Sequence, residues 1–430
     1  MQNCKPFDME NLTSHKAYYG HIVDNGAMLD EVLVTFFKAP HSFTGEDSAE
    51  ISVHGSVFIQ QKLLQVLIAH GCRMADAGEF TRRAFVNRKF DLAQAEAIAD
   101  LISSESEAAH RMAINQLKGE FSKELQVLRS KLLEMTSLME LELDFSEEDV
   151  EFADRNQLKA LLQETLDKVN KLKDSFRLGN AIKNGIPVAI VGQTNTGKST
   201  LLNALLGEDR AIVSDIAGTT RDTIEETLNI NGILYRFIDT AGLRKTDETI
   251  EKIGIERSYK KIAEANVVIG MLDATTGYES MLSSANEILS RVDFEHQQLI
   301  LCINKVDTLT DQGEALLGQL RLDLDNDAIM VICLSAKHKF GLNDLYNTLK
   351  HSQPLAAPDA TLVTNVRHYE ALLHTSESLV SVQQGLEMNT PTDLVSQDLR
   401  QAIYYLGSIT GEITTDEVLG TIFSRFCIGK

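Results

Sequence analysis

One octapeptide limits the fold of this chain more than any other feature. Residues 192–199 read Gly-Gln-Thr-Asn-Thr-Gly-Lys-Ser and fit the pattern G-x-x-x-x-G-K-[ST]. An apolar run at 188–191 precedes them, and a leucine-rich run at 201–206 follows. In a strand–loop–helix context, the backbone N–H groups of such a loop converge on phosphate, its lysine reaches the β and γ oxygens, and its serine ligates Mg²⁺. The motif predicts a P-loop nucleotide site that uses Lys198 and Ser199.

The sequence around this loop alternates short apolar runs with helical patterns. Near-continuous apolar runs are typical of buried parallel strands, and they occur at 188–191, 235–238, 267–272, 299–303 and 329–334. The turn signal Asn231-Gly232 separates two strand-like segments, 223–230 and 233–238, and predicts one antiparallel hairpin. We therefore expect a mostly parallel, Ras-like P-loop domain over residues 184–352.

Four more motifs follow the loop in order, each expected at or near a strand end. They are G-T-T at 218–220, D-T-A-G at 239–242, N-K-V-D at 304–307 and S-A-K at 335–337. The Thr220 hydroxyl is a second candidate Mg²⁺ ligand, Asp239 can hold the metal's water shell, and the Gly242 N–H can sense the γ-phosphate. Five motifs in this order predict a GTPase.

Guanine recognition is assigned to the last two motifs. The Asp307 carboxylate can accept from the ring N–H and amino group of guanine, which adenine does not present, and the 335–337 segment offers a backbone N–H to the guanine oxygen. A site built to satisfy such donors rejects a ligand that lacks them by roughly 10⁴ or more.

The residue that orients the attacking water is not at the position usual for Ras-like enzymes. Ras-like enzymes place a glutamine directly after D-x-x-G, but here that position is Leu243, whose aliphatic side chain cannot polarise water. Glu251 is the candidate catalytic residue, and an ordinary solvated helical glutamate is the alternative at that position. Arg244 and Lys245 fit charge clamps or ordinary surface residues.

Segments of other character flank the predicted GTPase domain. A small α+β domain is expected over residues 1–85, with strands at 32–37 and 51–53 and a helix at 56–70. A helical domain is expected in two parts, 86–183 and 353–430, with capping boxes at 91–94 and 414–417. The predicted fold class is therefore multidomain α/β and all-α, with the GTPase domain inserted in the helical domain.

Composition narrows the compartment and the partners. The formal net charge of −21 repels polyanions, so a nucleic acid must be met by a local basic patch. The densest basic cluster is Arg73, Arg82, Arg83, Arg88 and Lys89, which fits either tRNA contact or a plain surface. Five scattered cysteines exclude a disulfide framework, and neither a membrane span nor a signal pattern is evident. A cytoplasmic protein with no membrane partner is expected.

Five segments together resemble the MnmE (TrmE) family of tRNA modification GTPases. They are G-T-T-R-D at 218–222 with D-T-A-G-L-R at 239–244, S-F-T-G-E-D at 42–47, D-L-A-Q-A-E-A at 91–97 and the chain end F-C-I-G-K at 426–430. The resemblance implies a potassium-dependent GTP hydrolase, acting on an acid anhydride. With the flavoprotein MnmG, it would add a carboxymethylaminomethyl-type group to carbon 5 of the wobble uridine (position 34) of certain tRNAs. A tetrahydrofolate derivative, in the 5-formyl or 5,10-methylene form, would be the one-carbon donor.

The resemblance also implies a homodimer, a heterotetramer with MnmG, and a set of site residues. The GTP contacts would be Asn195, Thr196, Gly197, Lys198, Ser199, Thr200, Ser214, Asp215, Ile216, Ala217, Gly218, Thr219, Thr220, Asp239, Thr240, Ala241, Gly242, Asn304, Lys305, Asp307, Ser335, Ala336 and Lys337. Mg²⁺ would be held by Ser199 and Thr220, and K⁺ by Asn195, Ser214, Ile216 and Thr219. The family's catalytic glutamate maps onto Glu251.

Folate contacts carry over to Glu50, Lys89 and Lys430. The family's leading G-R-G-G-V-G segment, with its arginine, has no counterpart, so the chain starts roughly forty residues into the pattern and is expected to be truncated or wrongly started. Cys427 fits either a reactive thiol beside the folate or a small buried apolar residue. The alternative function is a GTP-switched RNA-binding or ribosome-assembly factor that shares only the GTPase domain.

Overall fold

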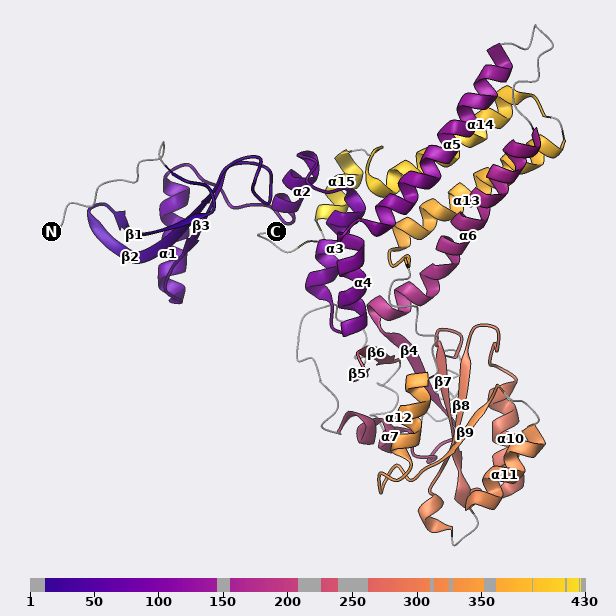
Figure 1. Cartoon of the computed structure of the whole chain (residues 1–430). Helices are drawn as coiled ribbons and strands as arrows, with labels where there is room; N and C mark the ends of the chain where they lie inside the picture. Colours follow the sequence, from indigo (N-terminus) through magenta and orange to yellow (C-terminus); the bar gives the residue numbers. More distant parts are fainter. Residues whose placement is uncertain are drawn as a thin grey trace. The chain divides into compact units, whose positions relative to one another are not determined.

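The computed structural model describes residues 12–144, 155–207, 226–238, 262–309, 313–324, 328–351, 361–388, 390–413, 416–424 and 426. The chain divides into two compact units (Figure 1). One comprises residues 1–102, 116–170 and 370–430, and the other comprises 103–115 and 171–369. Within the described residues, no helix combines the length and apolarity needed to cross a membrane.

A six-stranded sheet forms the centre of the second unit, in the order β5-β6-β4-β7-β8-β9. Its strands are β4 (Ile186–Val191), β5 (Glu226–Ile230), β6 (Ile233–Phe237), β7 (Val267–Asp273), β8 (Gln298–Asn304) and β9 (Met330–Cys333). β6, β4, β7, β8 and β9 run parallel, and β5 pairs antiparallel with β6 across the Asn231-Gly232 turn. The mostly parallel sheet and its single hairpin are therefore confirmed.

Helices cover both faces of this sheet, which explains its apolar strands. One core contains Val188 and Ile190 of β4 together with α7 (Lys198–Leu206) and α12 (Leu342–His351). The opposite core contains Ala189 and Val191 with α10 (Tyr278–Leu289) and α11 (Gly313–Leu324). Each large apolar side chain buried in this way stabilises the fold by about 1.5–3 kcal/mol. The result is a three-layer domain whose parallel strands end together at one edge (Figure 1).

The amino-terminal part of the other unit is a small antiparallel sheet with one helix packed on it. Strands β1 (Lys16–Asp24), β2 (Ala27–Phe37) and β3 (Ser48–Ser52) lie in that order, and α1 (Val57–Ala69) contacts β2. Val32 and Val34 are buried on the helix side, whereas Tyr19 and Leu33 are exposed. No residue of β1 is fully buried and the strand has no long continuous apolar run, which explains why it was not predicted from the sequence.

The remainder of this unit is helical. Its elements are α2 (Glu79–Val86), α3 (Leu92–Ser103), α4 (Glu107–Leu117), α5 (Glu120–Asp144), α6 (Arg155–Asn184), α13 (Val366–Glu387), α14 (Thr392–Thr410) and α15 (Asp416–Phe423), with α4, α6 and α13 shared between the units. Asp91 Oδ1 accepts from Gln94 N at 2.8 Å and Gln94 Oε1 from Asp91 N at 3.0 Å, so the first capping box forms. The second lies partly outside the described residues.

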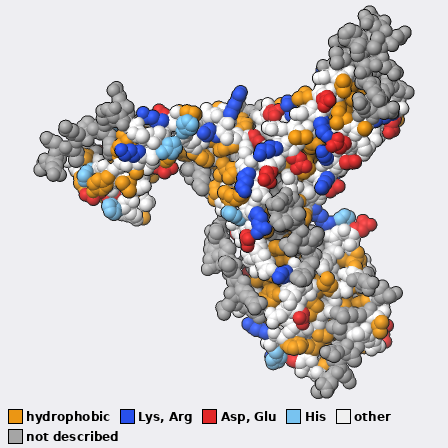
Figure 2. Space-filling model, in the orientation of Figure 1, with side chains coloured by type: hydrophobic (Ala, Val, Ile, Leu, Met, Phe, Trp, Pro, Cys, Tyr) orange, Lys and Arg blue, Asp and Glu red, His pale blue; other side chains and the backbone are white. Residues whose placement is uncertain are grey.

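Basic and acidic side chains are interspersed along the helical part on the face shown in Figure 2. Ion pairs such as Lys131–Glu164 and Arg129–Glu412 are part of this pattern. Interspersed charges of both signs are typical of a solvated protein surface.

Candidate nucleotide-binding site

The P-loop lies between the end of β4 and the start of α7. Its backbone turns through positive φ at Gly192 (148°), Asn195 (61°) and Gly197 (98°). A Cβ on Gly197 would lie 2.2 Å from Asn304 Nδ2, and one on Gly192 would lie 2.4 Å from the Met271 carbonyl oxygen. Both positions therefore require glycine for conformation and for space.

Lys198 closes this loop on itself. Its Nζ donates to the carbonyl oxygens of Gly192 at 2.9 Å and Gln193 at 2.7 Å, and the Thr196 hydroxyl also donates to Gln193 at 2.8 Å. Burial lowers the pKa of the Lys198 ammonium. Ser199 and Thr200 follow in the first turn of α7, where unpaired helix N–H groups favour an anion.

Asn304, at the end of β8, connects the P-loop to the 335–337 segment, which the sequence predicts to contact the base. Its Nδ2 donates to the Thr196 carbonyl at 2.8 Å, and its Oδ1 accepts from the Ala336 N–H at 3.0 Å. The side chain is buried, with the residue 3% exposed, so both bonds lie away from water. One amide thus brings together three motifs that are distant in the sequence.

Lys305 is held in the left-handed region, with φ of 65°, and its Nζ lies 2.6 Å from Asp273 Oδ2. Asp273 also accepts from the Thr275 N–H at 2.9 Å and hydroxyl at 2.7 Å. Burial raises the pKa of this carboxyl, but the bonds from Lys305 and Thr275 outweigh it and the net shift is downward. The sequence reasoning missed Asp273, although it ends a buried strand at the same sheet edge.

Asp307 lies in the short helix η4 (Val306–Thr308). A hydrogen bond from the Ser335 side chain, assisted by the charges of His338 and Lys337, lowers the pKa of the Asp307 carboxyl. His338 Nε2 lies 3.5 Å from Asp307 Oδ2. The segment itself is pinned by paired backbone bonds between Ser335 and Phe340, at 3.0 and 3.1 Å. Asp307 is thus kept ionised and can only accept hydrogen bonds.

Several predicted site residues lie outside the described residues. These are Ser214, Asp215, Ile216, Ala217, Gly218, Thr219, Thr220, Asp239, Thr240, Ala241, Gly242, Leu243, Arg244, Lys245, Glu251, Cys427 and Lys430. Their assignments stay predictions.

Of the two described folate candidates, one lies on the amino-terminal sheet and the other lies just after α2. Glu50 is exposed on β3 opposite Thr35, on the sheet face that also carries Tyr19 and Leu33. Lys89, just after α2, donates from Nζ to the Pro40 carbonyl at 2.8 Å.

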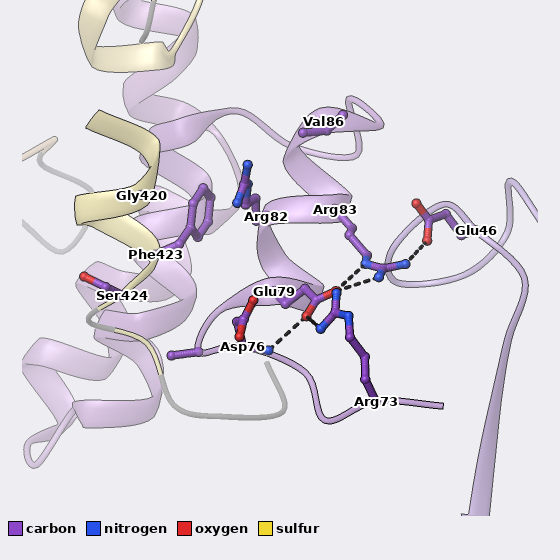
Figure 3. A pocket seen from close by; sticks show the side chains of 11 residues that line it. Glu46, Arg73, Asp76, Glu79, Arg82, Arg83, Val86, Gly420, Phe423 and Ser424 are labelled. Atoms are coloured by element: carbon purple, nitrogen blue, oxygen red, sulfur yellow. Dashed lines mark hydrogen bonds and ion pairs between the residues drawn. The ribbon is translucent and has the colours of Figure 1, made fainter. Parts of the chain in front are cut away.

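The predicted basic cluster is partly neutralised by acids. Glu79 accepts from Arg73 and Arg83 at 2.6 Å each, and Arg83 also reaches Glu46 at 2.8 Å (Figure 3). These bonds, first those from Arg73, lower the pKa of Glu79 to about 2. Two of the five basic residues are therefore engaged in ion pairs, which disfavours a tRNA-contact role for those two.

The sheet topology, the P-loop and the Asn304-to-Lys337 recognition segments define a P-loop GTPase. The MnmE helical domain model matches residues 92–427, and the model of the GTP-binding protein TrmE N-terminus matches residues 2–89. The chain belongs to the MnmE family.

Individual relatives agree with this assignment. The tRNA modification GTPase MnmE of Bacteroides fragilis is 51% identical, over 97% of this chain and 91% of the relative. That of Flavobacterium johnsoniae is 50% identical, over 100% and 92%. A solved structure of Aquifex aeolicus Era is 28% identical, covering 45% of this chain and 66% of that one, with a TM-score of 0.30.

Proposed function

We propose that this chain is a potassium-dependent GTP hydrolase that acts in tRNA modification. With the flavoprotein MnmG, it would add a carboxymethylaminomethyl-type group to carbon 5 of the wobble uridine of certain tRNAs. The observation that carries the proposal is the family match at both 2–89 and 92–427. Because this match extends well beyond the GTPase domain, it favours tRNA modification over a ribosome-assembly factor that shares only that domain.

The described P-loop fits a triphosphate and its Mg²⁺. Lys198 has carbonyl partners that phosphate oxygens can replace, and the replacement would give its buried charge a stronger acceptor. Ser199 would hold Mg²⁺ together with Thr220, and the ion would neutralise charge on the β and γ oxygens. Asp307 would select guanine, since its carboxylate is kept as an acceptor.

Potassium dependence is supported by the state of Asn195. This residue is exposed in the P-loop, and within the described part of the chain its side chain has no hydrogen-bond partner, so its amide oxygen is available as a ligand. Ser214, Ile216 and Thr219 would complete the ion's shell. A cation there supplies positive charge near the transferring phosphoryl group, as an arginine finger does elsewhere.

A tetrahydrofolate derivative is proposed at the amino-terminal domain. Glu50 offers a carboxylate for the donor groups of a pterin ring, beside the exposed Tyr19 and Leu33 of the same sheet face. Lys89 and Lys430 would meet the acidic tail. The bound folate would supply the one-carbon unit, and Cys427 would lie near it. We further propose that the protein is a cytoplasmic homodimer. Its amino-terminal domain would end at residue 85, the first part of its helical domain at 183 and its GTPase domain at 352.

Turnover in potassium and sodium buffers of equal ionic strength tests the GTPase part. Faster hydrolysis in potassium is expected, with the difference removed by Asn195→Ala, while Asn184→Ala, an exposed asparagine of α6, serves as the control. Equal rates in both salts would contradict the potassium assignment.

Mass spectrometry of wobble uridines from cells that lack the gene tests the modification part. Loss of the carboxymethylaminomethyl-type group is expected, and its return on complementation would tie the loss to this chain. Unchanged wobble uridines would contradict the proposed role while leaving the GTPase assignment intact.

A further inference from the structure

A pocket of about 440 Å³ lies between α2 and α15, within the compact unit that does not contain the P-loop (Figure 3). Its lining includes Asp76, Arg82, Val86, Gly420 and Phe423. This volume is within the range of sites that hold small molecules, and such sites combine apolar walls with a few convergent polar groups.

The walls of the pocket are held firmly. Phe423 is 2% exposed and packs on Phe85, with ring centroids 6.3 Å apart. Gly78, at the start of α2, approaches α15 so closely that a Cβ there would lie 2.6 Å from the Phe423 carbonyl oxygen. The pocket is therefore shaped by packing between two helices rather than by a loop.

A charge network fixes the side of the pocket opposite α15. Glu79, whose side chain is 12% exposed, is held by Arg73, Arg83 and the Asp76 N–H, the last at 2.9 Å. Arg83 also pairs with Glu46 at 2.8 Å. These four side chains, Glu46, Arg73, Glu79 and Arg83, neutralise one another and leave no net charge for a ligand.

Two further charged side chains line the pocket without such partners. Among the described residues, neither the Arg82 guanidinium nor the Asp76 carboxylate has a hydrogen bond or ion pair. Figure 3 shows Arg82 extending beside the Phe423 ring and Asp76 on the loop that leads into α2. The pocket therefore offers one cation and one anion beside an apolar wall.

This charge pattern selects the class of ligand. A polyanion such as RNA would find no excess positive charge, because the three arginines of the lining are balanced by Glu46, Asp76 and Glu79. A zwitterion would satisfy both unpartnered groups at once. We infer that the pocket binds a free α-amino acid with an apolar side chain, its carboxylate on Arg82, its ammonium on Asp76 and its side chain against Val86 and Phe423. The inference does not depend on the proposed tRNA modification.

Isothermal titration of the full chain tests this ligand class. L-leucine is expected to bind in the micromolar-to-millimolar range. N-acetyl-L-leucine, which lacks the ammonium, and L-leucine methyl ester, which lacks the carboxylate, are each expected to bind at least about tenfold more weakly. No binding of leucine at millimolar concentration, or equal binding of all three compounds, would overturn the inference.

Variants then locate the binding. Arg82→Gln and Asp76→Asn are each expected to weaken leucine binding at least about tenfold, whereas Arg291→Gln, a matched change at an arginine outside the pocket lining, leaves it unchanged. A Cβ on Gly420, which lines the pocket, would meet no heavy atom within 4 Å, so this position has room for a larger residue and Gly420→Leu is expected to occupy the pocket and abolish binding. Circular dichroism checks that each variant is folded. Normal leucine binding by folded Gly420→Leu would show that the ligand lies elsewhere.

Discussion

The nucleotide site and the α2–α15 pocket are built in opposite ways. The nucleotide site uses backbone groups and one buried neutral amide, Asn304, at the ends of parallel strands. The pocket uses the charged side chains of Glu46, Arg73, Glu79 and Arg83, which come from two separate stretches of the sequence. The side chains of both arginines are about half exposed or more. A site that is positioned by backbone groups and buried amides, like the nucleotide site, can be detected as a local sequence motif. A site that is positioned by surface charges from separate parts of the chain, like the pocket, has no such motif.

The two constructions also differ in what a lost contact costs. A buried donor or acceptor left unpaired costs the full desolvation of that group, about 1–3 kcal/mol. A solvent-exposed ion pair contributes about 0–1 kcal/mol, because water and salt screen it. Substitutions in the nucleotide site should therefore have larger effects than those in the charge network.

Glu251→Ala should give the largest effect, on catalysis. We expect kcat to fall by about 10²–10³, or roughly 3–4 kcal/mol, because Leu243 leaves the attacking water without a side-chain partner. GTP affinity should stay nearly unchanged, since Glu251 is not expected to touch GTP before the reaction. Stopped-flow turnover and a nucleotide titration measure both quantities, with the exposed Glu279→Ala as control. Normal turnover, or an equal loss of GTP affinity, would make Glu251 a structural residue.

Asp307→Asn should change nucleotide selection. GTP affinity should fall by about tenfold or more, because one of the two acceptor oxygens of the carboxylate is replaced by an NH2 group that cannot accept from guanine. Discrimination against xanthine nucleotides should relax, because the amide can donate to the extra oxygen. Competition titrations with GTP and XTP measure the change. Retained GTP affinity and base preference would contradict the assignment.

Asn304→Ala should affect stability and nucleotide binding together. It leaves the Ala336 N–H and the Thr196 carbonyl without their bonds in a buried place, so the free energy of unfolding should drop by about 2–4 kcal/mol. Urea unfolding of this variant and of the exposed control Asn184→Ala provides the comparison. A loss of stability no larger than that of the control would show that the two Asn304 hydrogen bonds contribute little to the free energy of unfolding.

Glu79→Gln should have the smallest effect, and it should depend on pH. The folded pKa of about 2 lies below the ordinary 4.5, so the ionised carboxylate stabilises the fold above pH 4.5, and this stabilisation is lost as pH falls towards 2. The variant should lose about 1 kcal/mol at pH 7, a value discounted because both arginines are largely exposed. Urea unfolding of the unmodified chain and of Glu79→Gln should show a smaller difference in free energy of unfolding at pH 4 than at pH 7. A difference that does not change with pH would mean that packing, not charge, explains it.

The same contrast explains what could be predicted from the sequence. The buried strands, the hairpin at Asn231-Gly232 and the capping box at Asp91 all have local signals, and the structure contains each of them. β1 has no fully buried residue, so it lacks the continuous apolar run by which the strands of the larger sheet are predicted. The α2–α15 pocket joins residues near 80 to residues near 420, a pairing that only tertiary packing creates.

The two hydrogen bonds from Asn304, to Thr196 and to Ala336, also determine how this site opens by local unfolding. The Ala336 amide hydrogen can exchange with solvent only when Asn304 moves, and the same movement releases the P-loop at Thr196. The P-loop and the segment predicted to recognise the base therefore belong to one cooperative opening unit, and loosening either one loosens both. A ligand that contacts only the P-loop would therefore still slow hydrogen exchange at the Ala336 amide.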